Sequence, residues 1–366
     1  VLTRLTSYLI ALALLLPVNG ISGDEEHPPK ASETRQGHIT IGLLLPDHSH
    51  TDVIEAAEFA IQQANAAGAY KGKEFKLVIR TAEGFWGAGS KESVSLVYED
   101  QARAIVGALD GRNGHLAEQV ATKSHLSYIE AFATEPTLSQ AFVPWFMRVV
   151  PNDNQQSATI VDQIQSEGGG RTGILSTQNY DTRYAVKSLT KAVAARTSMA
   201  PLVIELDTAS IQEEALLNTI LSKDLDHLVI PFDAAYLKDL IITLGKEKPD
   251  MKIYGTLHFT MGVESRNSGW APYEGVFMVG PLFDRSKYTA LPDSRSAYMY
   301  DAINLVVQAI RRVGTDRVSI TDYISDSEHP FAITGSISFD ELGNRLNAST
   351  LIRIKNGKPE MINQQP

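Results

Sequence analysis

Residues 38–68, HITIGLLLPDHSHTDVIEAAEFAIQQANAAG, contain the pattern that decides the fold. They open with an apolar run, residues 38–45, which has the length and composition of one buried strand. Residues 52–68 then place apolar side chains at helical spacing and end on Gly68, a residue type common just beyond a helix. A continuous apolar strand followed by an amphipathic helix is typical of a parallel sheet covered by helices.

The same strand-and-helix unit returns along the rest of the chain. In the first half, strands are predicted at 74–80, 103–108 and 126–131, with helices at 90–100 and 114–123. A second series starts near Ser157 and runs to a long predicted helix at 294–314. The chain closes with strands around the turn signal Asn356-Gly357. We therefore predict an α/β protein with two doubly wound parallel-sheet units and a β tail.

The composition limits what the chain can do. Its 366 residues suffice for about two domains. The formal net charge of -10 argues against nucleic acid as a partner. There is no cysteine, which excludes disulfides, thiolate metal ligands, a thiol nucleophile and a lipid-anchoring cysteine. Because catalytic, phosphate-loop and metal motifs are also missing, the sequence predicts neither an enzyme nor a cofactor.

The N-terminus has the features of a targeting segment. Arg4 precedes an uncharged apolar run, residues 7–18, which is too short for a comfortable membrane span. We predict a signal peptide at residues 1–23, with cleavage between Gly20 and Asp24, and a disordered lead-in at 24–37. The mature protein is expected to be exported, in the periplasm or beyond.

Polar, acidic and aromatic residues follow the predicted strands. Since open α/β sheets bind ligands at the carboxyl ends of their strands, these residues are candidates for a ligand site. In the first unit they are Trp86, Asp110, Gly111, Arg112, Glu130, Phe132, Ala133 and Thr134; in the second they are Tyr180, Asp233 and His258.

Several candidates also fit purely structural roles. Asp110, Asp181 and Thr134 are residue types that cap helices. His258 is more typical of a hydrogen-bonded histidine at a surface or hinge, and Trp86 would equally pack on a loop. These alternatives stay open at the level of sequence.

The order and spacing of several segments resemble the type I periplasmic solute-binding proteins, in particular the branched-chain amino-acid-binding branch used by ABC importers. Matching segments include AIVGALDG (104–111), FMRVVPNDNQQ (146–156) and GSISFDELGNR (335–345). The most specific is the pattern Gly-x-x-x-Phe-Asp-x-x-Gly within the last of these. The chain looks like a divergent member of that family.

This resemblance implies two lobes joined by three hinge crossings, near 149–152, near 281–283 and near Gly335. Lobe one would comprise residues 38–149 and 282–335, and lobe two residues 150–281 and 336–362. The family holds a small ligand between the lobes, with its carboxylate and ammonium bound mainly by loops of lobe one.

The resemblance also suggests residue roles. Ala133 and Thr134 would offer backbone and hydroxyl groups to the polar head of the ligand. Gly111 and Arg112 lie where the family often has a serine, so a plain amino acid is in doubt as the ligand. Glu130 would add an acidic group for a cationic head.

Three hypotheses follow. The first is a monomeric binding protein that captures a small polar molecule, such as an amino acid or a related compound, and delivers it to an ABC permease. The second is a ligand-sensing or regulatory envelope protein of the same fold that acts through a separate partner chain. The third, an envelope hydrolase, would need a carboxylate pair such as Asp110 and Glu130.

Overall fold

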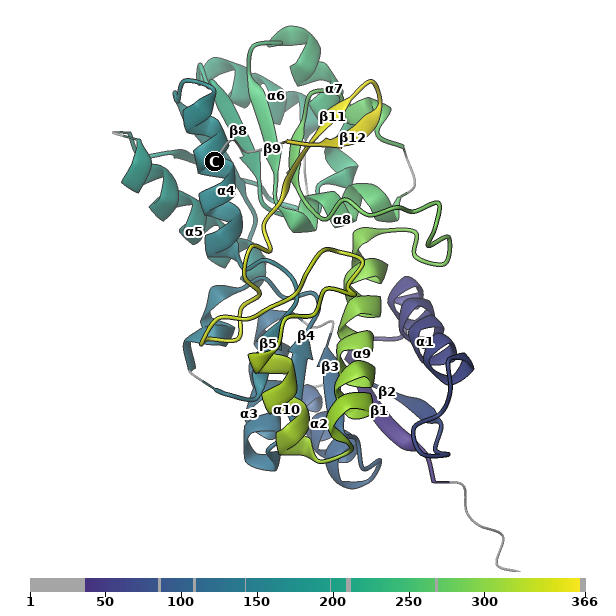
Figure 1. Cartoon of the computed structure of the whole chain (residues 1–366). Coiled ribbons are helices and arrows are strands. Elements are labelled where there is room, and N and C mark those ends of the chain that lie inside the picture. Colours follow the sequence, from purple (N-terminus) through teal and green to yellow (C-terminus); the bar gives the residue numbers. More distant parts are fainter. Residues whose placement is uncertain are drawn as a thin grey trace, which may run out of the picture. The chain divides into compact units, whose positions relative to one another are not determined.

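The computed structural model describes residues 37–84, 87–107, 110–141, 143–197, 199–208, 212–266 and 269–362, whose strands form two sheets (Figure 1). The first sheet is parallel and has the order β2-β1-β3-β4-β5. Its strands are β1 (Ile39–Leu45), β2 (Phe75–Thr81), β3 (Ala104–Gly107), β4 (Ser127–Glu130) and β5 (Phe146–Arg148).

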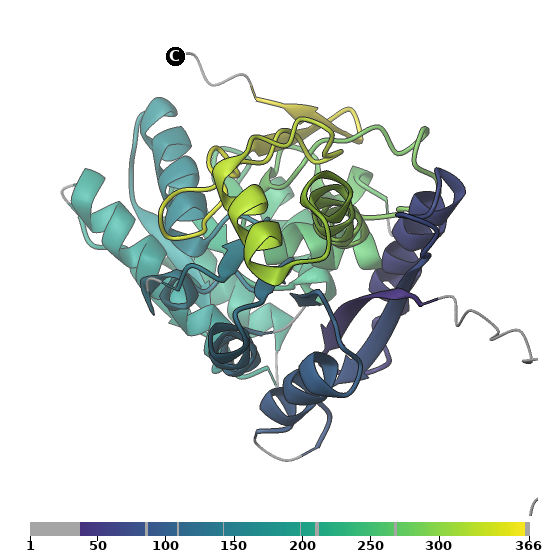
Figure 2. The same ribbon diagram turned by 60° about the horizontal axis from the view of Figure 1, so that its bottom comes forward.

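Helices cover both faces of this sheet. Side chains of β1 alternate, so that Leu43 and Leu45 enter one apolar cluster while Leu44 enters another. The first cluster is shared with α1 and α9, and the second with α2 and α3. Figure 2 shows these helices on their two sides of the strands. The helices of this lobe are α1 (Thr51–Ala66), α2 (Ala88–Tyr98), α3 (Gly111–Ser124), α9 (Ser294–Val313) and α10 (Arg317–Asp326), with the 3-10 helix η1 (Pro136–Ala141).

The second sheet has the order β12-β11-β10-β9-β8-β6-β7. Strands β6 to β10 are parallel, and the β11–β12 hairpin adds an antiparallel edge. Its strands are β6 (Thr172–Ser176), β7 (Leu202–Glu205), β8 (His227–Ile230), β9 (Lys252–Gly255), β10 (Phe277–Val279), β11 (Leu351–Lys355) and β12 (Lys358–Met361).

The second sheet is also covered on both faces. Ile174 of β6 packs into the cluster that contains α4 and α5, whereas Leu175 packs into the cluster that contains α6, α7 and α8. These helices are α4 (Asp153–Ser166), α5 (Tyr180–Arg196), α6 (Glu213–Ser222), α7 (Lys238–Glu247) and α8 (Leu257–Ser265), with η2 (Ala235–Leu237) and η3 (Ala271–Tyr273). The predicted class, two doubly wound α/β lobes, is confirmed.

The chain passes between the two sheets three times. It leaves β5 for α4, leaves β10 for α9, and returns from α10 to β11. We predicted the last crossing near Gly335, but residues beyond it still contact the first sheet. Arg148 N–H donates to the Gly343 carbonyl at 2.8 Å, and Arg345 N–H donates to the Arg148 carbonyl at 3.2 Å. The return to the second sheet therefore comes after Arg345.

The Phe-Asp-x-x-Gly turn is shaped by this contact. Gly343 has a φ of +75°, and an added Cβ would lie 2.0 Å from the Phe146 carbonyl oxygen. Only glycine lets the turn approach the edge of β5 so closely. The most specific motif of the sequence thus lies against the edge of β5, just before the last crossing between the sheets.

The predicted signal peptide and the predicted lead-in up to residue 36 lie outside the described residues. Among the described helices, none has the length and apolar character that crossing a bilayer requires.

Candidate functional site

A cavity of about 690 Å³ lies at the carboxyl ends of strands from both sheets. Its walls come from the segments that follow β4, β6, β7, β8 and β9. We call it the strand-end chamber; its lining residues are Phe132, Thr177, Asn179, Asp181, Thr182, Thr208, Glu213, Phe232, Asp233, Tyr236 and His258. Three of them, Phe132, Asp233 and His258, were candidates from the sequence.

The two lobes touch beside this chamber. The Gly111 N–H donates to Asp181 Oδ1 at 3.1 Å. The Arg112 guanidinium lies 4.9 Å from the ring centroid of Tyr180, within the range of a cation–π contact. These contacts bring together segments that lie 70 residues apart in the sequence.

His258 makes a further contact between the lobes. Its ring stacks on Phe132, with centroids 5.0 Å apart, and its Nε2 lies 3.3 Å from the Phe132 carbonyl oxygen. Burial lowers the pKa of His258, and the nearby Asp181 carboxylate opposes this without reversing it. The imidazole is therefore mostly uncharged at neutral pH.

Asp181 lies on the wall of the chamber at the start of α5. Burial raises its pKa, and repulsion from Asp110 and Glu135 adds to this, while the hydrogen bond from Gly111 lowers it. Asp181 does not cap its helix, because Asn179 accepts the first N–H groups of α5. Its carboxylate is instead directed at the opposite lobe.

The Phe132-Ala133-Thr134 loop is held from behind by Glu130. The N–H groups of Phe132 and Ala133 donate to Glu130 Oε1 at 2.8 and 2.9 Å. Glu130 is fully buried, and burial raises its pKa to about 7, although Tyr128 and the two N–H groups favour the charged form. A carboxylate of the chain thus occupies the backbone groups that the sequence suggested for a ligand.

Thr134 is buried as well, and its side chain hydrogen-bonds the Asp153 carboxyl. Burial raises the pKa of Asp153 to about 8. The guanidinium of Arg148 lies under the loop and donates to the carbonyls of Ala133 and Glu135 at 3.3 and 2.8 Å. The loop therefore has a rigid, internally bonded base, and its ligand contacts stay a prediction.

Asp110 has a structural role. It is the N-cap of α3 and accepts the Asn113 N–H at 2.8 Å. Trp86, the remaining candidate, lies outside the described residues.

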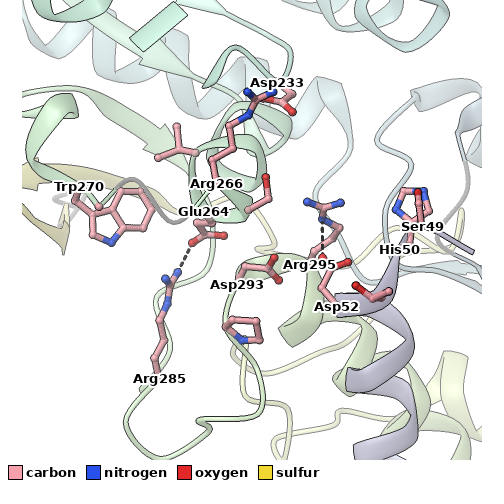
Figure 3. Close-up of a pocket in the computed structure, with 15 residues that line it drawn as sticks. Ser49, His50, Asp52, Asp233, Glu264, Arg266, Trp270, Arg285, Asp293 and Arg295 are labelled. Atoms are coloured by element: carbon pink, nitrogen blue, oxygen red, sulfur yellow. Dashed lines mark hydrogen bonds and ion pairs between the residues drawn. The ribbon is translucent and has the colours of Figure 1, made fainter. Parts of the chain in front are cut away.

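A second cavity of about 630 Å³ adjoins the first, because Asp233 lines both. We call it the crossing chamber, since residues of the crossing from β10 to α9 line one side (Figure 3). Its lining residues are Ser49, His50, Thr51, Asp52, Asp233, Val263, Glu264, Ser265, Arg266, Gly269, Trp270, Arg285, Pro292, Asp293 and Arg295.

Most charges of the crossing chamber are paired. Glu264 binds Arg285, whose guanidinium also lies 5.6 Å from the ring centroid of Trp270. Arg295 Nε lies 3.4 Å from Asp52 Oδ2. Figure 3 shows these two pairs, with Arg266 directed toward Asp233.

Sequence reasoning missed most of the crossing chamber, because its walls come from segments far apart in the chain, and it also missed α8. The segment after β9 was interpreted only as a strand end, and its apolar residues Leu257, Phe259, Met261 and Val263 alternate with a period of two, which is the pattern of a strand. Gly262 on α8 was a possible signal: an added Cβ would lie 2.0 Å from Asp233 Oδ1, so glycine leaves room for that carboxylate. Within the described residues, no group of three or more His, Asp or Glu side chains could hold a metal ion.

The comparison with protein families identifies the class of protein. A family model described as periplasmic binding protein matches residues 38–221, half of the chain. The chain therefore belongs to the periplasmic binding protein family. The predicted resemblance to its type I members is confirmed, and the chain is a divergent one.

Solved structures share the fold along nearly their whole length. One is the branched-chain amino acid transporter substrate-binding protein of Streptococcus pneumoniae in complex with isoleucine. It is 20% identical, with a TM-score of 0.74, and the match covers 89% of this chain and 99% of that chain. Another is a solute-binding protein of R. palustris in complex with benzoate. It is 16% identical, with a TM-score of 0.75, and the match covers 89% of this chain and 96% of that chain. The same architecture therefore accepts chemically different ligands.

Curated relatives match over shorter stretches. Glutamate receptor 3.1 of Oryza sativa is 28% identical over 100 residues, 27% of this chain and 11% of that protein. Glutamate receptor 3.7 of Arabidopsis thaliana is 33% identical over 70 residues, 19% of this chain and 8% of that protein. The match thus spans about a tenth of the length of either relative.

Proposed function

We propose that this protein is an exported binding protein that captures a small polar molecule, an amino acid or a related compound, between its lobes for an ABC importer. The observation that carries the proposal is the strand-end chamber of a periplasmic binding protein, a cavity of about 690 Å³ lined by loops of the second lobe and by Phe132 of the first. No bond is made or broken in this function.

Binding would act through a change between open and closed arrangements of the lobes. The contacts of Asp181 with Gly111, of Tyr180 with Arg112 and of His258 with Phe132 all join the two lobes. They would latch the closed form. A ligand that contacts both lobes binds that form better and increases its population.

The candidates then divide into groups. Phe132, Asp233 and His258 would contact the ligand, because they line the chamber. Gly111, Arg112 and Tyr180 would serve as the latch. Asp110, Glu130, Ala133 and Thr134 would hold the loops of lobe one in position.

Small-angle scattering combined with thermal unfolding tests this proposal. The protein from residue 24 onward is screened against amino acids, amines, amides, aromatic acids and sugars. A true ligand at about 100 times its Kd should raise the unfolding free energy by about 2.7 kcal/mol and reduce the radius of gyration. Stabilisation by a ligand without a smaller radius of gyration would contradict the hinge mechanism. A screen in which no compound stabilises the protein would contradict capture of a small molecule.

The matches to two plant glutamate receptors favour a second candidate, a ligand-sensing protein that acts through a separate partner chain. Compaction on ligand binding is expected in both cases. Uptake of the bound ligand by cells with and without the gene separates them, because only an importer component changes transport.

A further inference from the structure

The strand-end chamber has an unbalanced charge. Asp181, Glu213 and Asp233 contribute three carboxylates from three different segments, and the described lining contains no Lys or Arg. Burial raises the pKa of Asp181, and repulsion from Asp110 and Glu135 adds to this, while His258 and the Gly111 N–H lower it. A cation placed among these groups would be stabilised, and an anion would be repelled.

Six backbone N–H groups near the chamber are also bonded to side chains. Those of Phe132 and Ala133 donate to Glu130, those of Asp181 and Thr182 to Asn179, that of Gly111 to Asp181 and that of Ala235 to Asp233. Free N–H groups at strand ends and helix starts are the usual protein donors for a ligand carboxylate. These six serve side chains of the chain itself. The starts of α6 and α8 carry no side-chain cap, but Glu213 of the lining would oppose an anion at the start of α6.

The rest of the wall is half aromatic and half uncharged polar, the polar residues being Thr177, Asn179, Thr182 and Thr208. Phe132, Phe232 and Tyr236 line the chamber, together with the mostly uncharged ring of His258. Aromatic faces attract organic cations and also bury apolar groups. Carboxylates beside aromatic rings are thus suited to a molecule with a positive head and an apolar arm.

We propose that the ligand is an organic ammonium ion with an apolar or aromatic arm and no required carboxylate, its charge held by Asp181, Asp233 and Glu213. This inference rests on the proposed function, because it names the ligand class of the same chamber. The alternative is a zwitterionic ligand. Its carboxylate would have to reach Arg266, which lines the crossing chamber near Asp233 (Figure 3).

Two matched series of compounds test the ligand class by calorimetry. The first is phenethylamine, phenylalanine and 3-phenylpropanoate; the second is isopentylamine, leucine and 4-methylpentanoate. Within each series the apolar arm is constant, and only the charge of the head changes. We expect the amine to bind at least about tenfold more tightly than the zwitterion in one series or both, a difference of about 1.4 kcal/mol.

Tighter binding of a zwitterion or an anion, with compaction, would overturn the ammonium inference and leave the proposed function standing. If Arg266→Gln then abolished zwitterion binding, the carboxylate would be assigned to the crossing chamber. Failure of all six compounds to bind would overturn the ammonium inference, and the broader screen described above would decide the proposed function separately.

Substitutions of the lining carboxylates test which side chains hold the positive charge of the ligand. Asp233→Asn keeps an oxygen for the Ala235 N–H and should fold, but should weaken amine binding about tenfold or more. Glu213→Gln should have the same direction of effect. The matched control is Asp239→Asn, an exposed carboxylate on α7 that does not line the chamber. Unchanged amine affinity in both chamber variants would overturn the assignment.

Discussion

The two chambers that meet at Asp233 compensate their charges in different ways. In the crossing chamber, Glu264 and Asp52 each face an arginine, Arg285 and Arg295. In the strand-end chamber, the carboxylates line a cavity whose described walls contain no cationic Lys or Arg. The first arrangement pairs most of its charges within the chain, whereas the second has three carboxylates and no Lys or Arg in its described lining.

This difference separates stability from binding. Removing one member of a buried ion pair leaves an uncompensated charge and destabilises the fold. Removing a carboxylate from an unbalanced cavity relieves repulsion and should cost little stability. Substitutions in the crossing chamber should therefore change unfolding, and those in the strand-end chamber should change ligand binding.

The largest expected effect is that of Arg285→Met in the crossing chamber. The Glu264 side chain is buried, whereas Arg285 is 36% exposed. Losing the guanidinium should therefore lower the unfolding free energy by up to about 3 kcal/mol, the lower end for a fully buried pair. The loss should be larger at about pH 8 than at about pH 5, since a lone buried carboxyl takes up a proton at low pH. Urea unfolding measures both.

The double variant Glu264→Gln with Arg285→Met is the control, and should recover part of the lost stability because no unpaired charge remains. Amine binding should change little in either variant. If Arg285→Met had the same unfolding free energy as the unmodified chain, the proposed difference between the two chambers would be contradicted.

Next in size is the pH dependence that comes from Glu130 behind the Phe132 loop. Its pKa is about 7 in the folded protein, above the ordinary value of 4.5, so the folded state binds more protons between these values. The unfolding free energy should therefore fall as pH rises from about 4.5 to about 7. Glu130→Gln should remove a fall on the order of 1–3 kcal/mol.

Urea unfolding at about pH 4 and about pH 8 measures this, with Glu341→Gln, an exposed carboxylate, as the control. Equal pH dependence in Glu130→Gln and the unmodified chain would show that the buried carboxyl does not titrate as expected.

A smaller effect is expected for Tyr236→Leu in the strand-end chamber. The substitution keeps apolar bulk but removes the aromatic face, so amine affinity should fall about two- to fivefold, or roughly 0.5–1 kcal/mol. Calorimetry with phenethylamine and isopentylamine measures the loss. Tyr98→Leu, at an exposed tyrosine of α2 far from the chamber in the fold, is the control. Tighter amine binding in Tyr236→Leu would contradict a contact between the ligand cation and this aromatic ring.

The smallest effect is that of Arg266→Gln. This cation lines the crossing chamber beside Asp233, so its removal should strengthen amine binding slightly, by less than about 0.5 kcal/mol for a solvent-exposed charge. The effect should shrink further at high salt, because exposed charges are screened. Weaker amine binding would mean that Arg266 contacts the ligand itself.

Most of the fold could be predicted from local patterns. The apolar runs became buried strands, and Gly314 and Asn356-Gly357 ended the long helix and joined the last hairpin as predicted. Helices α8 and α10 were missed, because both are short and lie where neighbouring patterns were interpreted as strand or loop. The third crossing could not be placed, since the contact of Gly343 with β5 joins segments almost 200 residues apart.

The candidate site was predicted in outline only. Strand ends supplied Phe132, Asp233 and His258, because the carboxyl edge of a parallel sheet is visible in the order of elements. The sequence did not show that Ala133 and Thr134 contact side chains of the chain itself, because those contacts depend on how Glu130 and Asp153 are oriented.

By itself, the sequence determined the α/β class, the two lobes and the edge at which polar and aromatic side chains gather. These follow from periodicity and turn chemistry, which act between near neighbours in the chain. The tertiary structure alone decided which carboxylates are paired: Glu264 meets Arg285, while Asp233 and Glu213 line a cavity whose described walls contain no Lys or Arg. Arg266 lies beside Asp233 in the adjoining chamber. Electrostatic interactions depend on distance and burial in space, so the charge of a chamber exists only once segments far apart in sequence have been brought together.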